Sequence, residues 1–137
     1  MTERPTPGPI RAVKWVNSTA IAAAAGDIDL ASSSDFQRDL LALLAERPKR
    51  IIVDLSAVGY MDSSGVASLV KLLSRGRRYG TSLALAGLTQ RVRSIFEITR
   101  LSDIFDIRQT AEAALVEWPM PPRPTNNDQR NDQRPNV

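Results

Sequence analysis

Four consecutive residues near the middle of the chain have side chains suited to a regulatory reaction: Asp62-Ser63-Ser64-Gly65. They precede an amphipathic stretch, so we expect a helix to begin at this point. Asp and Ser satisfy the free N–H groups of a helix N-terminus, so one interpretation of the motif is a simple helix cap. The other is an exposed hydroxyl group at the positive end of a helix dipole, where an added phosphate is tolerated. The motif by itself leaves both interpretations open.

The composition argues against several classes of catalytic and metal site. The chain has no cysteine and no histidine, which excludes cysteine nucleophiles, disulfides, Ser-His-Asp triads and the common His/Cys zinc sites. No Gly-rich phosphate loop occurs, and the acidic residues do not cluster like metal ligands, so we expect neither metal nor cofactor. A phospho-receiver could use Asp54 as its acceptor, but Asp27 and Asp29 are not adjacent and no lysine follows Ile107. We therefore expect a protein that is not an enzyme.

The charge and hydropathy patterns argue against nucleic-acid binding and membrane insertion. The net charge is +3, the basic residues are scattered, and aromatic residues make up 5% of the chain, so nucleic-acid binding is not expected. No segment approaches the ~20 apolar residues of a membrane span, and the alanine-rich residues 20–25 are too few for a signal-peptide core. We expect no membrane insertion and a cytoplasmic location.

The chain divides into one domain with a polar segment at each end. Residues 1–9 contain three prolines and are expected to be a flexible lead-in. Residues 118–137 are rich in Pro, Asn, Gln and Arg and contain a tandem Asn-Asp-Gln-Arg repeat, which predicts a disordered polar tail. The folded domain is expected at residues 10–117.

Strand and helix patterns alternate within the domain in the order ββαβαβαβα. The consecutive β-branched residues 51–53 indicate a strand covered on both faces, as in a parallel sheet. The alternation predicts an α/β fold with a mixed sheet of four to five strands flanked by helices. We expect strands at residues 11–16, 19–25, 50–55, 81–86 and 104–107, and helices at residues 34–47, from the Asp-Ser-Ser-Gly motif to Gly80, at 90–99 and at 111–118.

The first predicted helix has a start signal of its own. Ser34 is followed three residues later by Gln37, which matches a capping box. Apolar residues then recur at helical spacing. This apolar face comprises Phe36, Leu40, Leu43 and Leu44.

A longer pattern around the motif decides between its two interpretations. Residues 54–66 read Asp-Leu-Ser-x-Val-x-x-Met-Asp-Ser-Ser-Gly-Val, which resembles the signature of the bacterial anti-sigma-factor antagonists, the family that names the STAS domain. Residues 26–29, Gly-Asp-Ile-Asp, resemble the Gly-Glu-(Ile/Leu)-Asp of the same family. Residues 80–87 and 92–101 are also similar to its later segments, so the resemblance covers about residues 10–116.

The resemblance implies a partner and a switch. In this family the unphosphorylated antagonist binds an anti-sigma factor that is also a serine kinase, which releases a sigma factor and so regulates transcription. The kinase phosphorylates the first serine of the motif, the antagonist dissociates, and a serine phosphatase reverses the reaction. The resemblance therefore implies a phosphoprotein with Ser63 as its phosphorylation site. The residues it implies for partner binding and switching are Asp29, Asp62, Ser63, Ser64 and Gly65.

A second role remains open within the same fold. STAS domains also serve as subunits of lipid-transport ABC systems and as scaffolds in sensory complexes. The paired serines favour the phosphorylation switch, but this preference rests on analogy.

Overall fold

The structure, a computed structural model, describes residues 8–117. The expected lead-in and tail lie outside the described residues, apart from Gly8 and Pro9. The carbonyl oxygen of Pro9 accepts a hydrogen bond of 2.9 Å from the N–H of Ala25, directly before the first strand begins.

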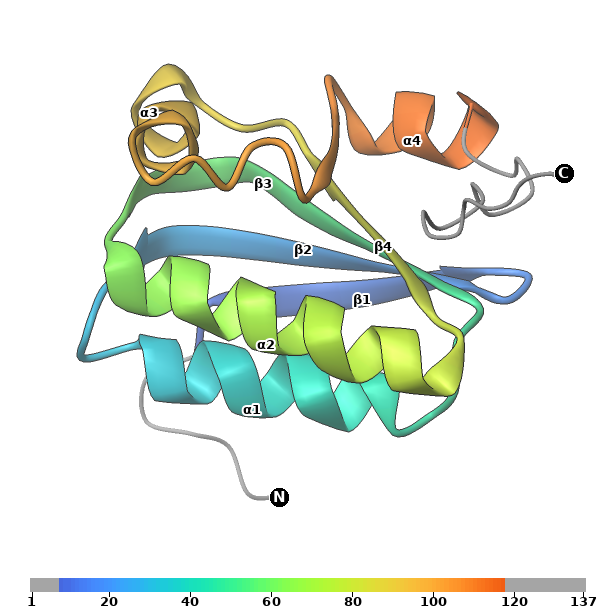
Figure 1. Ribbon diagram of the computed structural model, residues 1–137. Helices are drawn as coiled ribbons and strands as arrows, with labels where there is room; N and C mark the ends of the chain where they lie inside the picture. Colours follow the sequence, from blue (N-terminus) through green and yellow to red (C-terminus); the bar gives the residue numbers. More distant parts are fainter. Residues whose placement is uncertain (1–7, 118–137) are drawn as a thin grey trace, which may run out of the picture.

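Within the described residues, five strands and four helices follow one another in the predicted order ββαβαβαβα (Figure 1). The elements are β1 (Ile10–Val16), β2 (Thr19–Ile28), α1 (Ser33–Leu44), β3 (Arg50–Met61), α2 (Ser63–Tyr79), β4 (Ser82–Ala86), α3 (Gln90–Ile98), β5 (Asp106–Arg108) and α4 (Ala111–Glu117).

The strands form one mixed sheet in the order β1-β2-β3-β4-β5. β1 is antiparallel to β2, and β2 to β5 run parallel to one another. This confirms the predicted α/β fold. Because parallel strands carry their carboxyl ends to the same edge of a sheet, the ends of β2 and β3 lie side by side, with Ile28 paired to Met61.

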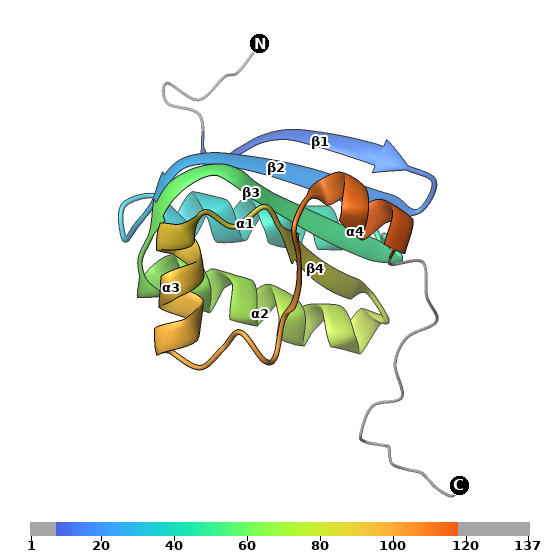
Figure 2. The ribbon, with the colours of Figure 1, turned by 90° about the horizontal axis from the view of Figure 1, so that it is seen from above.

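The helices cover the sheet unequally. α1 and α2 pack together on one face and build the main core with the central strands (Figure 1). α3 lies across the end of β3 and adds Val92 and Phe96 to that core. On the other face, Ala111 and Ala114 of α4 form a smaller apolar cluster with β3 and β4. Figure 2 shows α3 and α4 at opposite ends of the sheet.

The third strand is longer than predicted. We expected it to end at Leu55 and the following residues to form a connection, but β3 continues to Met61. β2 likewise continues past its predicted end to Ile28, with Gly26 at a φ of 85°. The two strands pair to their ends through shifts of register beyond Ala23, which break the regular alternation that the prediction relied on.

The predicted capping box in α1 is wrong. The helix begins at Ser33, so Ser34 lies inside the first turn and cannot be its cap. Ser32 flanks the helix instead, and its side chain makes no capping hydrogen bond. Its hydroxyl group accepts a hydrogen bond of 3.0 Å from the N–H of Asp29 and donates one of 3.0 Å to the carbonyl of Asp27. This turn fixes the entry to α1 in place of a capping box.

Candidate functional site

The second helix begins within the Asp-Ser-Ser-Gly motif, as predicted. Asp62 has an extended backbone, with φ −103° and ψ −173°, and Ser63 is the first helical residue. The Asp62 carboxylate accepts hydrogen bonds from the N–H of Ser64, at 2.9 Å, and from its hydroxyl group. The helix cap is therefore Asp62. At the other end, Gly80 stops the helix in the left-handed conformation with φ 74°, which also confirms the prediction.

The two serines of the motif have different surroundings. Ser64 is partly buried, and its hydroxyl group is occupied by Asp62. Ser63 is exposed, and its hydroxyl group makes no hydrogen bond with any residue that the structure describes. Of the two hydroxyl groups, that of Ser63 is the one open to a reagent in solution.

The carboxylate of Asp62 is held in its charged form. The hydrogen bond from the Ser64 hydroxyl group is the main cause that lowers the pKa of Asp62 from its ordinary value of 3.8, since a hydrogen bond donated to the charged form favours it. Burial opposes this shift, and the backbone N–H groups of Ser64, Gly65 and Leu30 lower the pKa further. At neutral pH a negative charge therefore stands in the residue next to the Ser63 hydroxyl group.

Asp29 lies at the same edge of the sheet as Asp62. The two aspartates follow directly after Ile28 and Met61, which are paired at the ends of β2 and β3. The N–H of Asp62 donates a hydrogen bond of 3.0 Å to the carbonyl of Ile28, so the start of α2 is attached to the end of β2. The structure thus places Asp29 and the whole motif at one edge; their roles in partner binding stay a prediction.

The side chain of Asp29 also holds the loop after β2 in shape, a role that the sequence did not predict. The Asp29 carboxylate accepts hydrogen bonds from the N–H groups of Ala31, at 3.0 Å, and Ser32, at 3.2 Å, so it shapes the loop. An Asp followed by Ser three residues later is a signal for such a turn. The side chain of Leu30, between them, is 79% exposed. No local signal predicts this exposure, because a leucine beside a strand end is usually assigned to the core.

Gly65 allows α2 to begin close to the strand ends. A Cβ atom at this position would lie 2.6 Å from Cγ of Met61 and 2.8 Å from Cγ2 of Ile28, and both distances are too short for real contacts. These neighbouring atoms belong to side chains at the ends of the two strands. The glycine brings the motif directly onto the ends of β2 and β3.

Comparison with known proteins identifies the family of this chain. The family model described as STAS domain matches residues 12–114. The chain belongs to the STAS domain family. The anti-sigma-B factor antagonist of Bacillus subtilis (strain 168) is 36% identical over 91 residues, which cover 66% of this chain and 83% of the relative. The resemblance stated from the sequence is confirmed.

Solved structures have the same fold as this STAS domain. An anti-sigma factor antagonist from Mycobacterium paratuberculosis has a TM-score of 0.68 at 22% sequence identity, covering 77% of this chain and 90% of that protein. The anti-sigma factor antagonist SpoIIAA in its unphosphorylated form has a TM-score of 0.67 at 18% identity, covering 77% of this chain and 93% of that protein.

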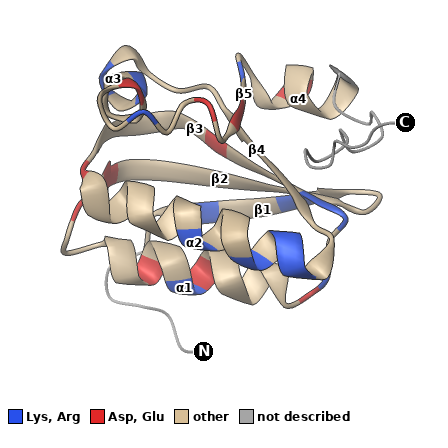
Figure 3. Ribbon diagram, viewed as in Figure 1, with Lys and Arg blue, Asp and Glu red and all other residues tan. Residues whose placement is uncertain are grey.

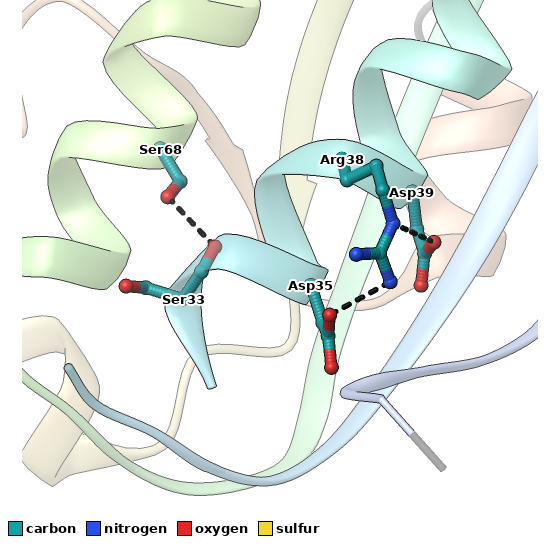
Figure 4. Close-up of polar contacts among 5 residues, drawn as sticks. All are labelled: Ser33, Asp35, Arg38, Asp39 and Ser68. Carbon is teal, nitrogen blue, oxygen red and sulfur yellow. Dashed lines mark hydrogen bonds and ion pairs between the residues drawn. The ribbon is translucent and has the colours of Figure 1, made fainter. Parts of the chain in front are cut away.

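A buried serine joins the site of this STAS domain to the first helix. The hydroxyl group of Ser68 lies 3.1 Å from the carbonyl of Ser64, one turn earlier in α2, and 3.4 Å from the carbonyl of Ser33 at the start of α1 (Figure 4). Both contacts are within hydrogen-bonding distance. The first turns of the two helices are therefore held together directly behind the motif.

The charge at this edge of the STAS domain is negative. On α1, Arg38 forms ion pairs with Asp35, at 2.7 Å, and Asp39, at 3.8 Å (Figure 4). The acidic residues at the ends of β2 and β3 are Asp27, Asp29 and Asp62, and Figure 3 shows acidic segments there. Within residues 8–117, no group of three or more acidic side chains could hold a metal ion. No helix in this range is long and apolar enough to cross a membrane.

Proposed function

We propose that this STAS domain is an anti-sigma factor antagonist whose binding to its partner is switched by phosphorylation of Ser63. The main support is the contrast between the two serines: the Ser63 hydroxyl group is exposed and has no hydrogen-bond partner among the described residues, whereas Asp62 holds that of Ser64. The curated relative is named as an antagonist, and SpoIIAA is described in an unphosphorylated form, which implies a phosphorylated one.

The unmodified domain binds an anti-sigma factor with serine-kinase activity through the sheet edge that carries Asp29, Leu30, Asp62 and Ser63. The exposed Leu30 side chain supplies apolar area, and the aspartates supply charge and hydrogen-bond acceptors. A regulatory contact of this kind should bury about 1,600 Å² or less in total. The hydrogen bonds of the Asp29 turn keep this surface in shape before the partner arrives.

Phosphorylation ends the interaction without unfolding the domain. The phosphate adds about −1.5 to −2 charges at pH 7. The N-terminus of α2 accepts this charge in the free domain, so the fold is kept. In the complex, the same group would be desolvated beside the charged Asp62, where lost hydration and like charge both oppose it. A cost of about 3 kcal/mol lowers affinity roughly a hundredfold. A serine phosphatase then restores binding.

Phosphosite mapping tests the proposal. The full chain is incubated with ATP and, in turn, with each anti-sigma factor of the source genome that has a kinase domain, and the modified residue is identified by mass spectrometry. We expect phosphate on Ser63 and none in the Ser63→Ala variant. Phosphate on Ser64 alone, or on neither serine, would overturn the switch. Binding to a lipid-transport subunit and to no anti-sigma factor would favour the alternative role instead.

A further inference from the structure

A second surface lies at the end of the helical layer that is remote from Ser63. A groove of about 270 Å³ opens between the C-terminal ends of α1 and α2. Two leucines of α1 and the alanine that follows the helix form the apolar part of its lining, and two arginines and a tyrosine complete it. The lining residues are Leu41, Leu44, Ala45, Arg47, Arg75 and Tyr79, and we call the groove the Arg47–Arg75 groove.

Arg47 has a left-handed backbone, as Arg100 does after α3. It follows the end of α1 with a φ of 61°, in the left-handed region that ordinarily favours glycine. Gly80, directly after α2, is left-handed with a φ of 74°, and Arg100, shortly after α3, has the same φ of 61° as Arg47. At Arg47 the side chain turns back over the ring of Tyr79, with the guanidinium carbon 4.4 Å from the ring centroid. This cation–π contact fixes a positive charge at the mouth of the groove.

The surroundings of the groove are strongly basic. Lys71, Arg75 and Arg78 follow one another at helical spacing along the exposed side of α2, and Lys49 stands in the loop after α1. None of these four side chains forms an ion pair with a residue in the described part of the chain. In Figure 3, the Lys and Arg positions of α2, drawn in blue, lie mostly in its C-terminal half.

The helix dipole explains only part of this arrangement. Cations near a helix C-terminus are favourable, which accounts for the basic last turn of α2. The dipole does not account for the leucine side chains that line the groove together with Arg47 and Arg75. Glu46, the neighbouring acid in the sequence, lines a different groove, between α1 and β1.

We propose that the Arg47–Arg75 groove binds an acidic protein segment in which carboxylates alternate with aliphatic side chains. Planar guanidinium groups match carboxylates in paired hydrogen bonds, and Leu41 and Leu44 in the lining offer apolar contact to an aliphatic group. The groove has a volume of about 270 Å³ and is lined by residues at two helix ends, so it suits a few side chains of a peptide. A nucleic-acid backbone would need a longer track of cations and exposed aromatic faces.

The groove is separate from the proposed switch. The 17 residues of α2 span about 25 Å at 1.5 Å per residue, and Ser63 is at the far end. A segment bound in the groove would therefore remain bound in both phosphorylation states. The inference does not depend on the proposed function, because no step in it uses Ser63.

A peptide titration tests the groove in the full chain. The probe is a short synthetic peptide of alternating Glu and Leu, titrated at low and at high salt and followed by NMR amide shifts. The controls are polyglutamate of the same length, a DNA oligonucleotide and vesicles containing anionic lipid. The variants are Arg75→Glu and Arg47→Gly, the second of which suits the left-handed backbone and removes only the side chain. Arg91→Glu, at an exposed position in α3, matches the charge change of Arg75→Glu.

We expect salt-dependent, saturable binding of the Glu-Leu peptide, with shifts at the groove residues. Arg75→Glu should weaken binding by roughly tenfold or more, Arg47→Gly should weaken it several-fold, and Arg91→Glu should leave it near the parent value. Ser63→Asp should bind the peptide like the parent, whatever it does to the anti-sigma factor. Absent binding, equal losses in Arg75→Glu and Arg91→Glu, or shifts elsewhere would overturn the proposal. So would equal binding of polyglutamate, or tighter binding of the oligonucleotide or vesicles.

Discussion

Ser64 donates two hydrogen bonds to the carboxylate of Asp62, one from its backbone N–H and one from its hydroxyl group. The pair closes the first turn of α2 and keeps Asp62 charged. Ser64 therefore has a structural task that Ser63 does not share. We therefore expect changes at Ser64 to alter the pKa of Asp62, and changes at Ser63 to alter partner binding.

Replacing Ser64 with alanine should raise the pKa of Asp62 toward 3.8, because it removes the largest cause of the lowered value. The NMR titration of the Asp62 carboxyl carbon measures this change. Since the folded pKa is below the ordinary value, the stabilisation is present above the ordinary pKa and is lost as pH falls through the folded pKa. In Ser64→Ala, the fall of Tm below about pH 4 should therefore be smaller than in the parent. Ser63→Ala is the matched control, and an unchanged Asp62 pKa in Ser64→Ala would contradict the assigned cause.

Changes at Ser63 should alter partner binding and leave stability alone. Ser63→Ala should bind the anti-sigma factor at all times and resist phosphorylation. Ser63→Asp should bind more weakly, by up to roughly a hundredfold, because it places a second charge beside Asp62. Calorimetric titration measures the affinities, and both variants should melt near the parent temperature because the side chain is exposed. Full affinity in Ser63→Asp together with full affinity in the phosphorylated parent would exclude the switch.

Substitutions of Asp29 can separate its charge from its role in the loop. Asp29→Asn keeps an oxygen that accepts the hydrogen bonds of Ala31 and Ser32, so its Tm should stay near that of the parent. Asp29→Ala loses these bonds and should cost about 1 kcal/mol of unfolding free energy. Both should bind the anti-sigma factor more weakly if the carboxylate contacts it. If Asp29→Asn binds with the affinity of the parent, the charge of Asp29 does not contribute to binding and the residue only holds the loop in its conformation.

Gly65→Ala should destabilise the domain by about 1–3 kcal/mol, because the new methyl group would overlap Met61 and the stiff branched side chain of Ile28. Thermal unfolding measures this, with a fall in Tm of roughly 4–8 °C per kcal/mol for a domain of this size. Gly59→Ala is the control, because its Cβ would meet only Asp27 Oδ1, at 4.0 Å. Similar Tm values for the two variants would mean that the start of α2 can move away from the strands.

The order of the elements could be predicted from the sequence because apolar periodicity reports on burial. The apolar stripe of α1 and the β-branched run of β3 are buried as expected, and Ile51, Ile52 and Val53 are at most 1% exposed. The end of β3 could not be predicted in this way. Beyond Asp54, the strand includes exposed residues and a shifted register, so its continuation depends on pairing with β2.

The start of α1 and the Arg47–Arg75 groove could not be predicted from the local sequence either. Ser32, Ser33 and Ser34 are all suited to capping, and local sequence does not distinguish them. The choice is made by the hydrogen bonds of Ser32 to Asp27 and Asp29. The contact of Arg47 with Tyr79 joins residues far apart in the chain, so no local pattern indicates it. The motif, in contrast, was predictable because Asp62 caps a helix through its own neighbours.

The length of β3 has a consequence for the speed of the proposed switch. The strand reaches Met61, and Asp62 alone separates it from α2, so the acceptor hydroxyl group is presented on rigid backbone. A kinase or phosphatase would meet Ser63 in its native conformation and would not have to wait for a local opening of the fold. The rate of modification would then be limited by the encounter with the enzyme. A variant stabilised elsewhere in the core would be phosphorylated as fast as the parent. Local unfolding on warming toward the unfolding transition would not increase the rate of phosphorylation further.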